Sequence, residues 1–462
     1  MVASPSPNSA PPRRAPLARR MFAAVDIASL VCFRICFGLL MLVEVWRDLP
    51  DVAYTYLEPE FHFTYFGFDW VRPWPGDWMY VHFGVLGLCA LCVALGLCYR
   101  VAALVFFVGF SLVFLMEQGT YLNHAYLIAL IGFLMTVVPA HRAFSLDAWL
   151  RPQLRRETAP AWALWLLRAQ IGIPYFYAGL AKVNPDWLRG EPLRMWLADR
   201  ARDSVFGSLF TQEWVVYFFS YGGLVFDLLV VPALLWPRTR PIAYALTLCF
   251  HLTNAYTFSI GIFPWLMIAA TTIFFSPDWP RRVRDRVGAW LGAVPIDPPP
   301  RLAPPPPRLR VGQKATLWFV ATYVGWQLLF PLRHWLYPGD VAWTEEGHKF
   351  AWRMKLRDKD GWVSFYATDP ATGATWPIAP REYLTWWQEE EMTGRPEMIL
   401  QFAHHLAREL RAQGHAAIEI RAVALVSLNG RPRQLLIDPA VDLAAVQPSL
   451  WPAPWIRRDY VR

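Results

Sequence analysis

The chain has 462 residues, of which 55% are hydrophobic, 16% are aromatic and only 17% are charged. Soluble domains carry roughly 25% charged residues, so this composition excludes a disordered chain, a coiled coil and a collagen, and it argues against a wholly soluble protein. Lys and Arg outnumber Asp and Glu by 44 to 36. In a membrane protein such an excess usually lies in cytoplasmic loops, so we expect no nucleic-acid partner.

The first part of the chain predicts a membrane domain. Residues 1–21 are rich in Pro, Ser and Arg and predict a disordered, basic cytoplasmic tail. Residues 22–336 contain apolar runs of about 20 residues, the length that crosses about 30 Å of hydrocarbon. They predict a polytopic α-helical domain of about nine transmembrane helices, with a proline-rich cytoplasmic linker at 277–313. The expected spans are 25–47, 77–97, 100–117, 122–140, 161–182, 213–236, 240–258, 261–276 and 314–336.

The loop charges predict the orientation of this domain. Lys and Arg concentrate in the segments that are cytoplasmic if the N-terminus is inside. An odd number of spans then places residues 337–462, which contain no further apolar run, outside the cytoplasm. They predict a β-rich α+β domain, with a helix at 396–413 and a hairpin turn at Asn429-Gly430 between strands. The expected strands are Phe350–Leu356, Trp362–Ala367, Ala374–Ile378, Ala417–Leu428 and Gln434–Ile437.

Ionisable side chains at membrane depth are costly unless they are paired or face a cavity, so they are functional candidates. Lys182, at the end of an expected span, is the only lysine in the first 313 residues. Unlike an arginine, a desolvated lysine can lose its proton and act as a base. Its helix face also carries Tyr175, Ala178 and Gly179, and the two small residues leave room for a flat ligand or for a close helix.

Other polar residues lie at the same depth as Lys182. Asn123 and His124 begin one expected span, and His251 and Asn254 lie three residues apart on one face of another. Lys182 could instead reach the outer membrane interface, and both histidines could be buried side chains bonded to carbonyl groups. Convergence of independent polar groups at one depth is nevertheless what a site needs, so we predict a site here without naming a reaction.

Arg168 lies on nearly the same helix face as Lys182, about 21 Å deeper. It is expected to have a structural role, in an ion pair with Asp227 or Glu44.

Several separate segments between residues 22 and 445 carry motifs in a specific order. They are Asn123–Leu127, Leu167–Trp187, Phe250–Asn254, Phe258–Phe263, Phe275–Arg281, Gly347–Met354 and Ile437–Asp442. They resemble motifs of the vitamin K-dependent γ-glutamyl carboxylases. The first segment resembles the Asn-His motif of that family and the second its catalytic-lysine segment. The next three resemble its second histidine motif, and the last two its outer-domain motifs. The chain resembles a bacterial-type, shorter member of that family with an HTTM-like membrane domain.

The resemblance implies an enzyme, a peptidyl-glutamate carboxylase. It would couple oxygenation of reduced vitamin K, a hydroquinone of the phylloquinone or menaquinone type, to addition of CO₂ at the γ-carbon of a peptidyl glutamate. The quinone would leave as its epoxide, with O₂ and CO₂ as co-substrates and no metal. The catalytic residues implied are Lys182 as the basic amine, with His124 and His251. The residues expected to bind the quinone are Asn123, Tyr175, Ala178, Gly179 and Asn254.

Two interpretations are open for the residues that would recognise the substrate. Tyr383, Trp386, Trp387 and Arg395 lie where the family places residues near the glutamyl peptide, but the aromatic residues could instead be domain core or membrane-interface anchors. His404, His405 and Glu409 are expected on a solvated helix face, so they predict no metal site.

The chain also departs from the animal members of the family. Those enzymes are longer, so part of their propeptide-binding region is expected to be absent or altered here. Their lumenal disulfide cannot form because no cysteine follows Cys249, and Ala181 stands where they have a second lysine. We therefore expect an enzyme of a bacterial inner membrane that meets lipid, quinone and a glutamate-containing peptide on the outer side. The alternatives are a quinone epoxidase without protein carboxylation and a non-catalytic quinone- or lipid-binding transporter.

Overall fold

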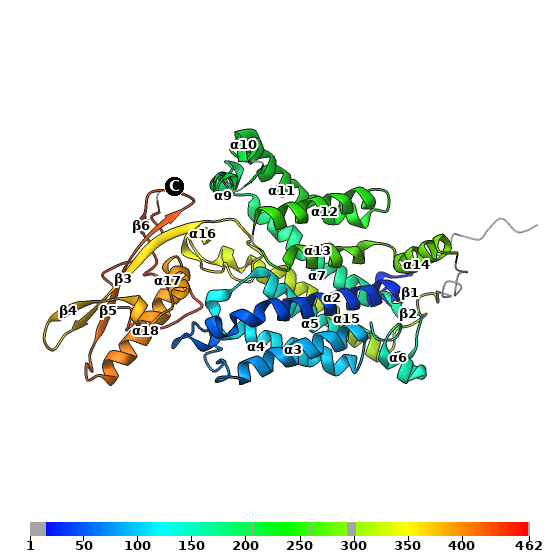
Figure 1. The fold of residues 1–462 in the computed structure, drawn as a ribbon, viewed down its shortest axis with the longest axis horizontal. Helices are drawn as coiled ribbons and strands as arrows, with labels where there is room; N and C mark the ends of the chain where they lie inside the picture. Colours follow the sequence, from blue (N-terminus) through cyan, green and yellow to red (C-terminus); the bar gives the residue numbers. More distant parts are fainter. Residues whose placement is uncertain (1–14, 203, 206, 259, 293–301, 461–462) are drawn as a thin grey trace, which may run out of the picture.

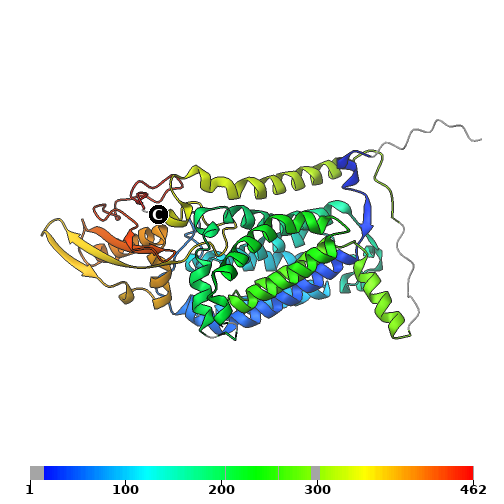
Figure 2. The ribbon, with the colours of Figure 1, turned by 90° about the horizontal axis from the view of Figure 1, so that it is seen from above.

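A bundle of long helices forms most of the molecule, and a smaller domain built on a β-sheet covers one end of the bundle (Figures 1 and 2). The computed structural model describes residues 15–202, 204–205, 207–258, 260–292 and 302–460. The long helices are α2 (Ala28–Asp48), α3 (Trp78–Leu95), α4 (Tyr99–Met116), α5 (Asn123–Val137), α7 (Ala161–Lys182), α11 (Glu213–Leu235), α12 (Arg240–Thr257) and α15 (Val311–Leu329). Shorter helices are α1 (Leu17–Arg20), α6 (Leu146–Leu150), α8 (Pro185–Leu188), α9 (Leu193–Ala201), α10 (Gly207–Phe210), α13 (Phe263–Thr271), α14 (Trp279–Trp290) and α16 (Val341–Thr344).

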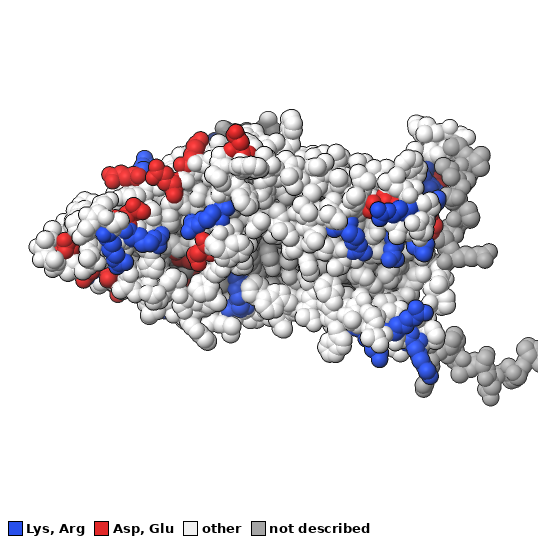
Figure 3. Space-filling model, turned by 90° about the horizontal axis from the view of Figure 1, so that it is seen from below, with Lys and Arg blue, Asp and Glu red and all other residues white. Residues whose placement is uncertain are grey.

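Each of the nine expected spans contains one of these helices. Among the described residues, five helices are long and apolar enough to cross a membrane, namely α2, α3, α4, α11 and α15. Helices α5 and α13 are apolar but shorter, and α7 and α12 are long enough but less apolar. The count of nine spans therefore stays a prediction. Figure 3 shows an almost uncharged band across the middle of the molecule, with Lys and Arg gathered towards its two ends.

Helix α7 lies at the centre of the bundle, where it contacts α5, α11, α13 and α15. Its Arg168 does not make the predicted ion pair with Asp227 or Glu44. The guanidinium instead donates hydrogen bonds to the carbonyl groups of Ile273 and Phe275, both at 2.9 Å. These carbonyls follow α13, at a helix end that leaves acceptors without partners, so the arginine satisfies them and is itself satisfied.

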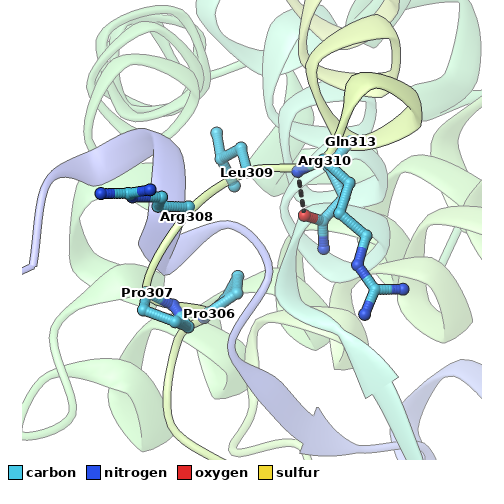
Figure 4. Close-up of a pocket in the computed structure, with 6 residues that line it drawn as sticks. All are labelled: Pro306, Pro307, Arg308, Leu309, Arg310 and Gln313. Atoms are coloured by element: carbon cyan, nitrogen blue, oxygen red, sulfur yellow. Dashed lines mark hydrogen bonds between the residues drawn. The ribbon is translucent and has the colours of Figure 1, made fainter.

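The end of the bundle opposite the sheet is rich in arginine. Strands β1 (Ala24–Asp26) and β2 (Thr158–Pro160) form a short antiparallel pair there, and Arg281 of α14 forms an ion pair with Asp26 at 2.9 Å. Figure 4 shows the start of α15, where the main-chain N–H of Arg310 donates to the side chain of Gln313 at 2.9 Å. Of the predicted basic tail and linker, residues 1–14 and 293–301 lie outside the described residues. The described parts include the helices α1 and α14.

The C-terminal domain, called the outer domain after its predicted side of the membrane, is a four-stranded antiparallel sheet in the order β4-β3-β5-β6, with two helices packed on it. Phe365 of β3 lies opposite Ala422 of β5, and both side chains face a core completed by Phe402. The strands and helices are β3 (Lys359–Asp369), β4 (Ala374–Ile378), β5 (Glu419–Leu428), β6 (Gln434–Leu435), α17 (Trp386–Thr393) and α18 (Pro396–Ala412).

One predicted strand of this domain is wrong. Residues 350–356 form an irregular loop in which Phe350, Trp352 and Lys355 have φ angles of 61°, 57° and 49°. A left-handed backbone cannot pair in a sheet and costs about 1–2 kcal/mol per L-residue. Packing against the membrane domain offsets this cost. The ring centroids of Phe350 and Trp352 lie 4.9 and 5.0 Å from that of Tyr126.

Candidate active site

A cavity of about 1210 Å³ lies between the membrane domain and the outer domain. Its walls come from α7, α11, α12, α13 and the start of α5, and its mouth lies against residues 345–357 and Arg395 of the outer domain. The cavity brings together seven of the predicted site residues in the membrane domain. They are Asn123, His124, Tyr175, Ala178, Lys182, His251 and Asn254.

Lys182 is buried at the end of α7 and is paired with a carboxylate. Its Nζ lies 2.5 Å from Oδ2 of Asp227 on α11, and it sits above the ring of Trp187 with 5.1 Å between the nitrogen and the ring centroid. Both side chains of the pair are almost inaccessible to solvent, with 8% and 3% of their surface exposed. Lys182 therefore does not reach out to the membrane interface. Asp227, predicted as a partner of Arg168, is therefore the partner of this amine and is available to share its proton.

His251 is held by a second polar group inside the cavity. Its Nε2 lies 2.7 Å from the hydroxyl of Tyr175, whose oxygen also lies 3.3 Å from Oγ1 of Thr271. The other ring nitrogen, Nδ1, is buried and has no hydrogen-bond partner among the described residues. A buried polar atom without a partner costs about 1–3 kcal/mol. The histidine therefore offers an unused hydrogen-bonding position to a polar group of a ligand.

His124 and His251 lie on either side of one aromatic ring. The ring of Phe263 stacks on His124 and meets His251 edge-on, with centroids 5.8 Å away in both cases. Asn123, next to His124, accepts a hydrogen bond from the hydroxyl of Tyr121 at 3.1 Å and donates to the carbonyl of Arg353 at 3.4 Å. Asn123 thus links the intramembrane part of the cavity to the loop of the outer domain at its mouth.

The two small residues on the face of Lys182 have different surroundings. Ala178 lines the cavity, whereas Gly179 does not. A Cβ added to Gly179 would lie 2.8 Å from two side-chain carbons of Leu228 and 3.0 Å from its main-chain nitrogen. Of the two possibilities open at this position, Gly179 serves the close approach of a helix. It lets α11 come near enough for Asp227, the neighbour of Leu228, to reach Lys182.

The mouth of the cavity carries several cations held by one carboxylate. Glu345 lies 2.6 Å from Nε of Arg357 and 3.0 Å from Nζ of Lys359, and His348 lies 4.0 Å away. Burial acts to raise the pKa of Glu345, but Arg357 and Lys359 outweigh it and hold the pKa well below its ordinary value. The carboxylate is therefore ionised at neutral pH and fixes the cations around it.

Of the four residues predicted to lie near a peptide, Arg395 lines the cavity and the other three do not. The ring of Tyr383 packs on Phe402 in the domain core, 6.1 Å between centroids. Trp387 packs on Tyr54 at 6.2 Å, and Trp386 is largely exposed to solvent. Tyr383 thus occupies a position in the domain core, as in the alternative interpretation, whereas Trp387 contacts the membrane domain.

Below the polar groups, the cavity continues as an apolar groove between α11 and α12. Val225, Leu229 and Ala233 line it on one side, and Leu246 and Ile242 line it on the other as far as Thr239. From His251 to Thr239 the helix rises about 18 Å, so the groove is long enough for an extended apolar chain. The cavity as a whole suits an amphipathic ligand with its polar head at Lys182 and His251.

Sequence reasoning missed some of the polar residues of this site. Asp227 was recognisable as a carboxylate inside an apolar helix, but its partner was not. Glu345 and Lys355 gave no signal, because charged residues in a water-soluble domain are ordinary, and Arg353 was noted only as part of the Gly347–Met354 motif. Within the described ranges, no group of three or more His, Cys, Asp or Glu side chains is placed to hold a metal ion.

The apolar helices, the uncharged band and the amphipathic cavity define an integral membrane protein with a ligand cavity beneath an outer domain. The family model of the HTTM domain matches residues 22–279, more than half of the chain. The model of the lumenal domain of vitamin K-dependent gamma-carboxylase matches residues 312–459. The chain therefore belongs to the vitamin K-dependent gamma-carboxylase family, which confirms the resemblance in the sequence. No solved structure matches it.

Proposed function

We propose that this protein is a vitamin K-dependent γ-glutamyl carboxylase of a bacterial inner membrane, with its N-terminus in the cytoplasm and its outer domain outside. The observation that carries the proposal is that one cavity joins three chemically different parts. A buried amine lies at its centre, an apolar groove leads down from that amine, and a basic mouth opens towards the outer domain. The amine can accept a proton, the apolar groove suits a lipid-soluble quinol, and the basic mouth suits an acidic peptide.

The residues present fit a bound hydroquinone. The unpartnered Nδ1 of His251 and the amide of Asn254 can bond to ring oxygens, while Phe226 and Phe263 supply flat apolar walls. Reduced vitamin K, once bound, supplies the electrons and the strong base that the carboxylation requires. Overall, the hydroquinone, O₂, CO₂ and a glutamyl residue become the quinone epoxide, water and γ-carboxyglutamate.

In this proposal Lys182 removes the first proton from a ring hydroxyl group. Asp227, 2.5 Å away, can hold the proton of the lysine, so the pair stays neutral overall whichever group is protonated. Because two separate charges are costly to bury, a proton that passes from the amine to the carboxylate leaves the amine free to act as a base. His251 and His124 orient the ring or stabilise developing negative charge.

The walls of the cavity would also protect the reaction. Apolar side chains of α11, α12 and α13 surround the polar groups and limit access of water. A dry site prevents water from protonating a strong base or a carbanion before CO₂ is captured.

The test uses the full-length protein in lipid nanodiscs with a reduced naphthoquinone, O₂ and isotopically labelled bicarbonate as the source of CO₂. A short peptide with two adjacent glutamates is compared with the same peptide carrying glutamines. A carboxylase forms epoxide and adds the mass of CO₂ to the glutamyl peptide alone. Epoxide without a mass gain would identify a quinone epoxidase, and neither product would identify a binding or transport protein. Mass spectrometry of periplasmic proteins with and without the gene then identifies the natural substrate.

A further inference from the structure

Two basic side chains at the mouth of the cavity, Arg353 and Lys355, differ from the other basic side chains there because neither forms an ion pair with a described residue. Among the described residues, Lys349 is paired with Glu397 at 2.8 Å, Arg357 is paired with Glu345, and Arg395 is paired with a carboxylate of α17. Arg353 and Lys355 also line the cavity, yet neither has a carboxylate of the described chain within the 4.0 Å of an ion pair. Their positive charge is therefore available to a ligand.

The loop that carries these two side chains is held firmly. Phe350 and Trp352 pack on Tyr126 of the membrane domain, and the main-chain carbonyl of Arg353 accepts a hydrogen bond from Asn123. The left-handed backbone at Trp352 and at Lys355 persists because these contacts hold it. A strained loop fixed on both sides of a charged residue presents that residue in one place, as a binding site requires.

Arg353 has a buried polar atom without a partner in the described part of the chain. The residue as a whole is partly buried, but its Nε is inaccessible and has no hydrogen bond to a described residue. Burial lowers the pKa of the guanidinium, and the neighbouring carboxylates oppose this only from beyond ion-pair distance. Lys355 is exposed, and its Nζ lies 5.4 Å from the ring centroid of Trp196 and 5.5 Å from that of Phe258. A buried donor without a partner is costly, so an anionic acceptor beside Arg353 is favoured, and the ammonium of Lys355 can bind the same anion.

We propose that Arg353 and Lys355 form a carboxylate-binding subsite that holds the glutamyl side chain of the substrate at the mouth of the cavity. This inference rests on the proposed function. A planar guanidinium matches the two oxygens of a carboxylate, and an ammonium two residues further along supplies a second, adaptable donor. The subsite opens into the same cavity as Lys182, so a glutamate held there faces the place where the base is generated. Of the four residues predicted to lie near the peptide, Arg395 lines the same cavity.

The test measures binding of a fluorescein-labelled peptide with two adjacent glutamates to the full-length protein in nanodiscs, by fluorescence anisotropy. The same peptide with glutamines is the reference ligand. In Arg353→Gln and in Lys355→Met, the Kd for the glutamyl peptide should rise about 10- to 100-fold, as expected for the loss of a hydrogen bond to a charged group. Arg353→Lys keeps the charge but loses the planar fork, so its Kd should lie between those of the wild type and Arg353→Gln. Affinity for the glutamine peptide should change little in all three variants.

Arg421→Gln is the matched control, because Arg421 lies exposed on β5 and pairs with Glu419 away from the cavity. It should bind the glutamyl peptide like the wild type, and melting temperatures verify that the other variants are folded. If the wild type prefers the glutamyl peptide and both Arg353→Gln and Lys355→Met bind it equally tightly, the subsite is elsewhere and the proposed function survives. If the wild type does not distinguish the two peptides, the proposed function itself fails. Displacement of the labelled peptide by inorganic phosphate as effectively as by glutamate would identify a general anion site and overturn the assignment.

Discussion

Lys182 and Asp227 form a buried pair of side chains on which the proposed chemistry depends. Their polar atoms are 2.5 Å apart inside the bundle, where two full charges would be costly to desolvate. The proton can lie on either group without changing the net charge of the pair. In the proposed function, a lysine in this setting can act as a base without first releasing its proton to water, because the carboxylate can accept it.

This arrangement predicts that Asp227→Asn lowers turnover while the protein still folds. Asparagine keeps the size of the side chain but cannot accept the lysine proton, so epoxide formation should fall about 100-fold or more. The measurement is the initial rate of epoxide formation in nanodiscs. Glu213→Gln, at the exposed start of the same helix, is the control and should keep the wild-type rate. A rate in Asp227→Asn within twofold of the wild type would mean that the carboxylate only helps α7 and α11 to pack.

For single residues, the sequence predicted how deep each polar side chain lies in the membrane domain. It did not predict which side chains pair with each other. The outer halves of the expected spans indicated that His124, Lys182 and His251 would lie around one space, and all three line the cavity. The sequence could not distinguish Lys182 from Arg168 as the partner of Asp227, because both face the same side of α7. The choice depends on which part of α11 crosses α7, and on carbonyl groups beyond α13 that occupy Arg168.

Helices α7 and α11 can approach closely because α7 has a glycine at their contact. Gly179→Ala would place a Cβ 2.8 Å from the side chain of Leu228 and 3.0 Å from its main-chain nitrogen. A rigid helix backbone cannot easily give way, so we expect a loss of stability of about 1–3 kcal/mol and a lower rate of epoxide formation as Asp227 moves away. Thermal unfolding and epoxide assays check both effects.

Gly84→Ala is the control for this variant, because a Cβ at Gly84 on α3 meets no atom within 4 Å. It should be neutral or slightly stabilising, since alanine favours a helix. Equal behaviour of the two variants would contradict a packing role for Gly179.

The groove between α11 and α12 should determine how long a quinone tail the protein accepts. Leu246→Trp adds bulk to the wall of the groove below the polar groups. We expect the KM for a quinol with a long isoprenoid tail to rise about tenfold, since a blocked groove loses apolar contacts. The KM for a quinol without a tail should stay the same, because its ring binds above the substitution. Leu252→Trp, on the exposed face of α12 outside the cavity, is the control, and a similar loss for both quinols would contradict the assignment of the groove.

The loop at 350–356 explains why the sequence predicted most elements of the outer domain but not this one. Its alternation of apolar and polar residues resembles a strand. Phe350 and Trp352, however, pack against aromatic residues of the membrane domain and not against a neighbouring strand. Such a distant partner leaves no local pattern, whereas β3, β4 and β5 pair with each other and were readable from their own periodicity.

The two domains are joined by polar contacts as well as by the chain. Asp186, after α7, accepts hydrogen bonds from Arg431 and Asn429 of the outer domain at 2.9 and 2.8 Å. Burial acts to raise the pKa of Asp186, but these donors outweigh it and hold the pKa below its ordinary value. Docking stabilised by Asp186 is therefore fully present above the ordinary pKa of aspartate, about 3.9, and is lost as the pH falls further.

Acid should consequently loosen the outer domain before it unfolds the bundle. Protection of residues 429–431 against hydrogen exchange, corrected for the pH dependence of the intrinsic rate, should fall as the pH drops below about 4 in the wild type. Asp186→Asn should show the lower protection already at neutral pH, with a cost of about 1.5–3 kcal/mol for the lost charged hydrogen bonds. Asp360→Asn, in an exposed pair with Arg433, should behave like the wild type. Protection that is independent of both pH and Asp186 would show that the apolar contacts alone hold the domains together.

For the whole molecule, apolar runs and strand periodicity were sufficient to predict a helical membrane domain followed by a sheet-containing domain. The cavity between them could not be predicted, because it depends on how the loop around Arg353 packs against the ends of α5 and α12. Its lining combines side chains that are more than 200 residues apart, such as Asn123 and Arg353.

The central claim is that the amine of Lys182 is the base, and Lys182→Arg tests it most directly. Arginine keeps a positive charge beside Asp227 but does not deprotonate, so the account predicts that epoxide formation falls at least about 100-fold in nanodiscs supplied with quinol and O₂. Lys314→Arg, at the exposed start of α15, should keep the wild-type rate. A small external amine base should restore part of the activity of Lys182→Ala. If Lys182→Arg instead forms epoxide at a rate close to the wild type, the lysine is not the base.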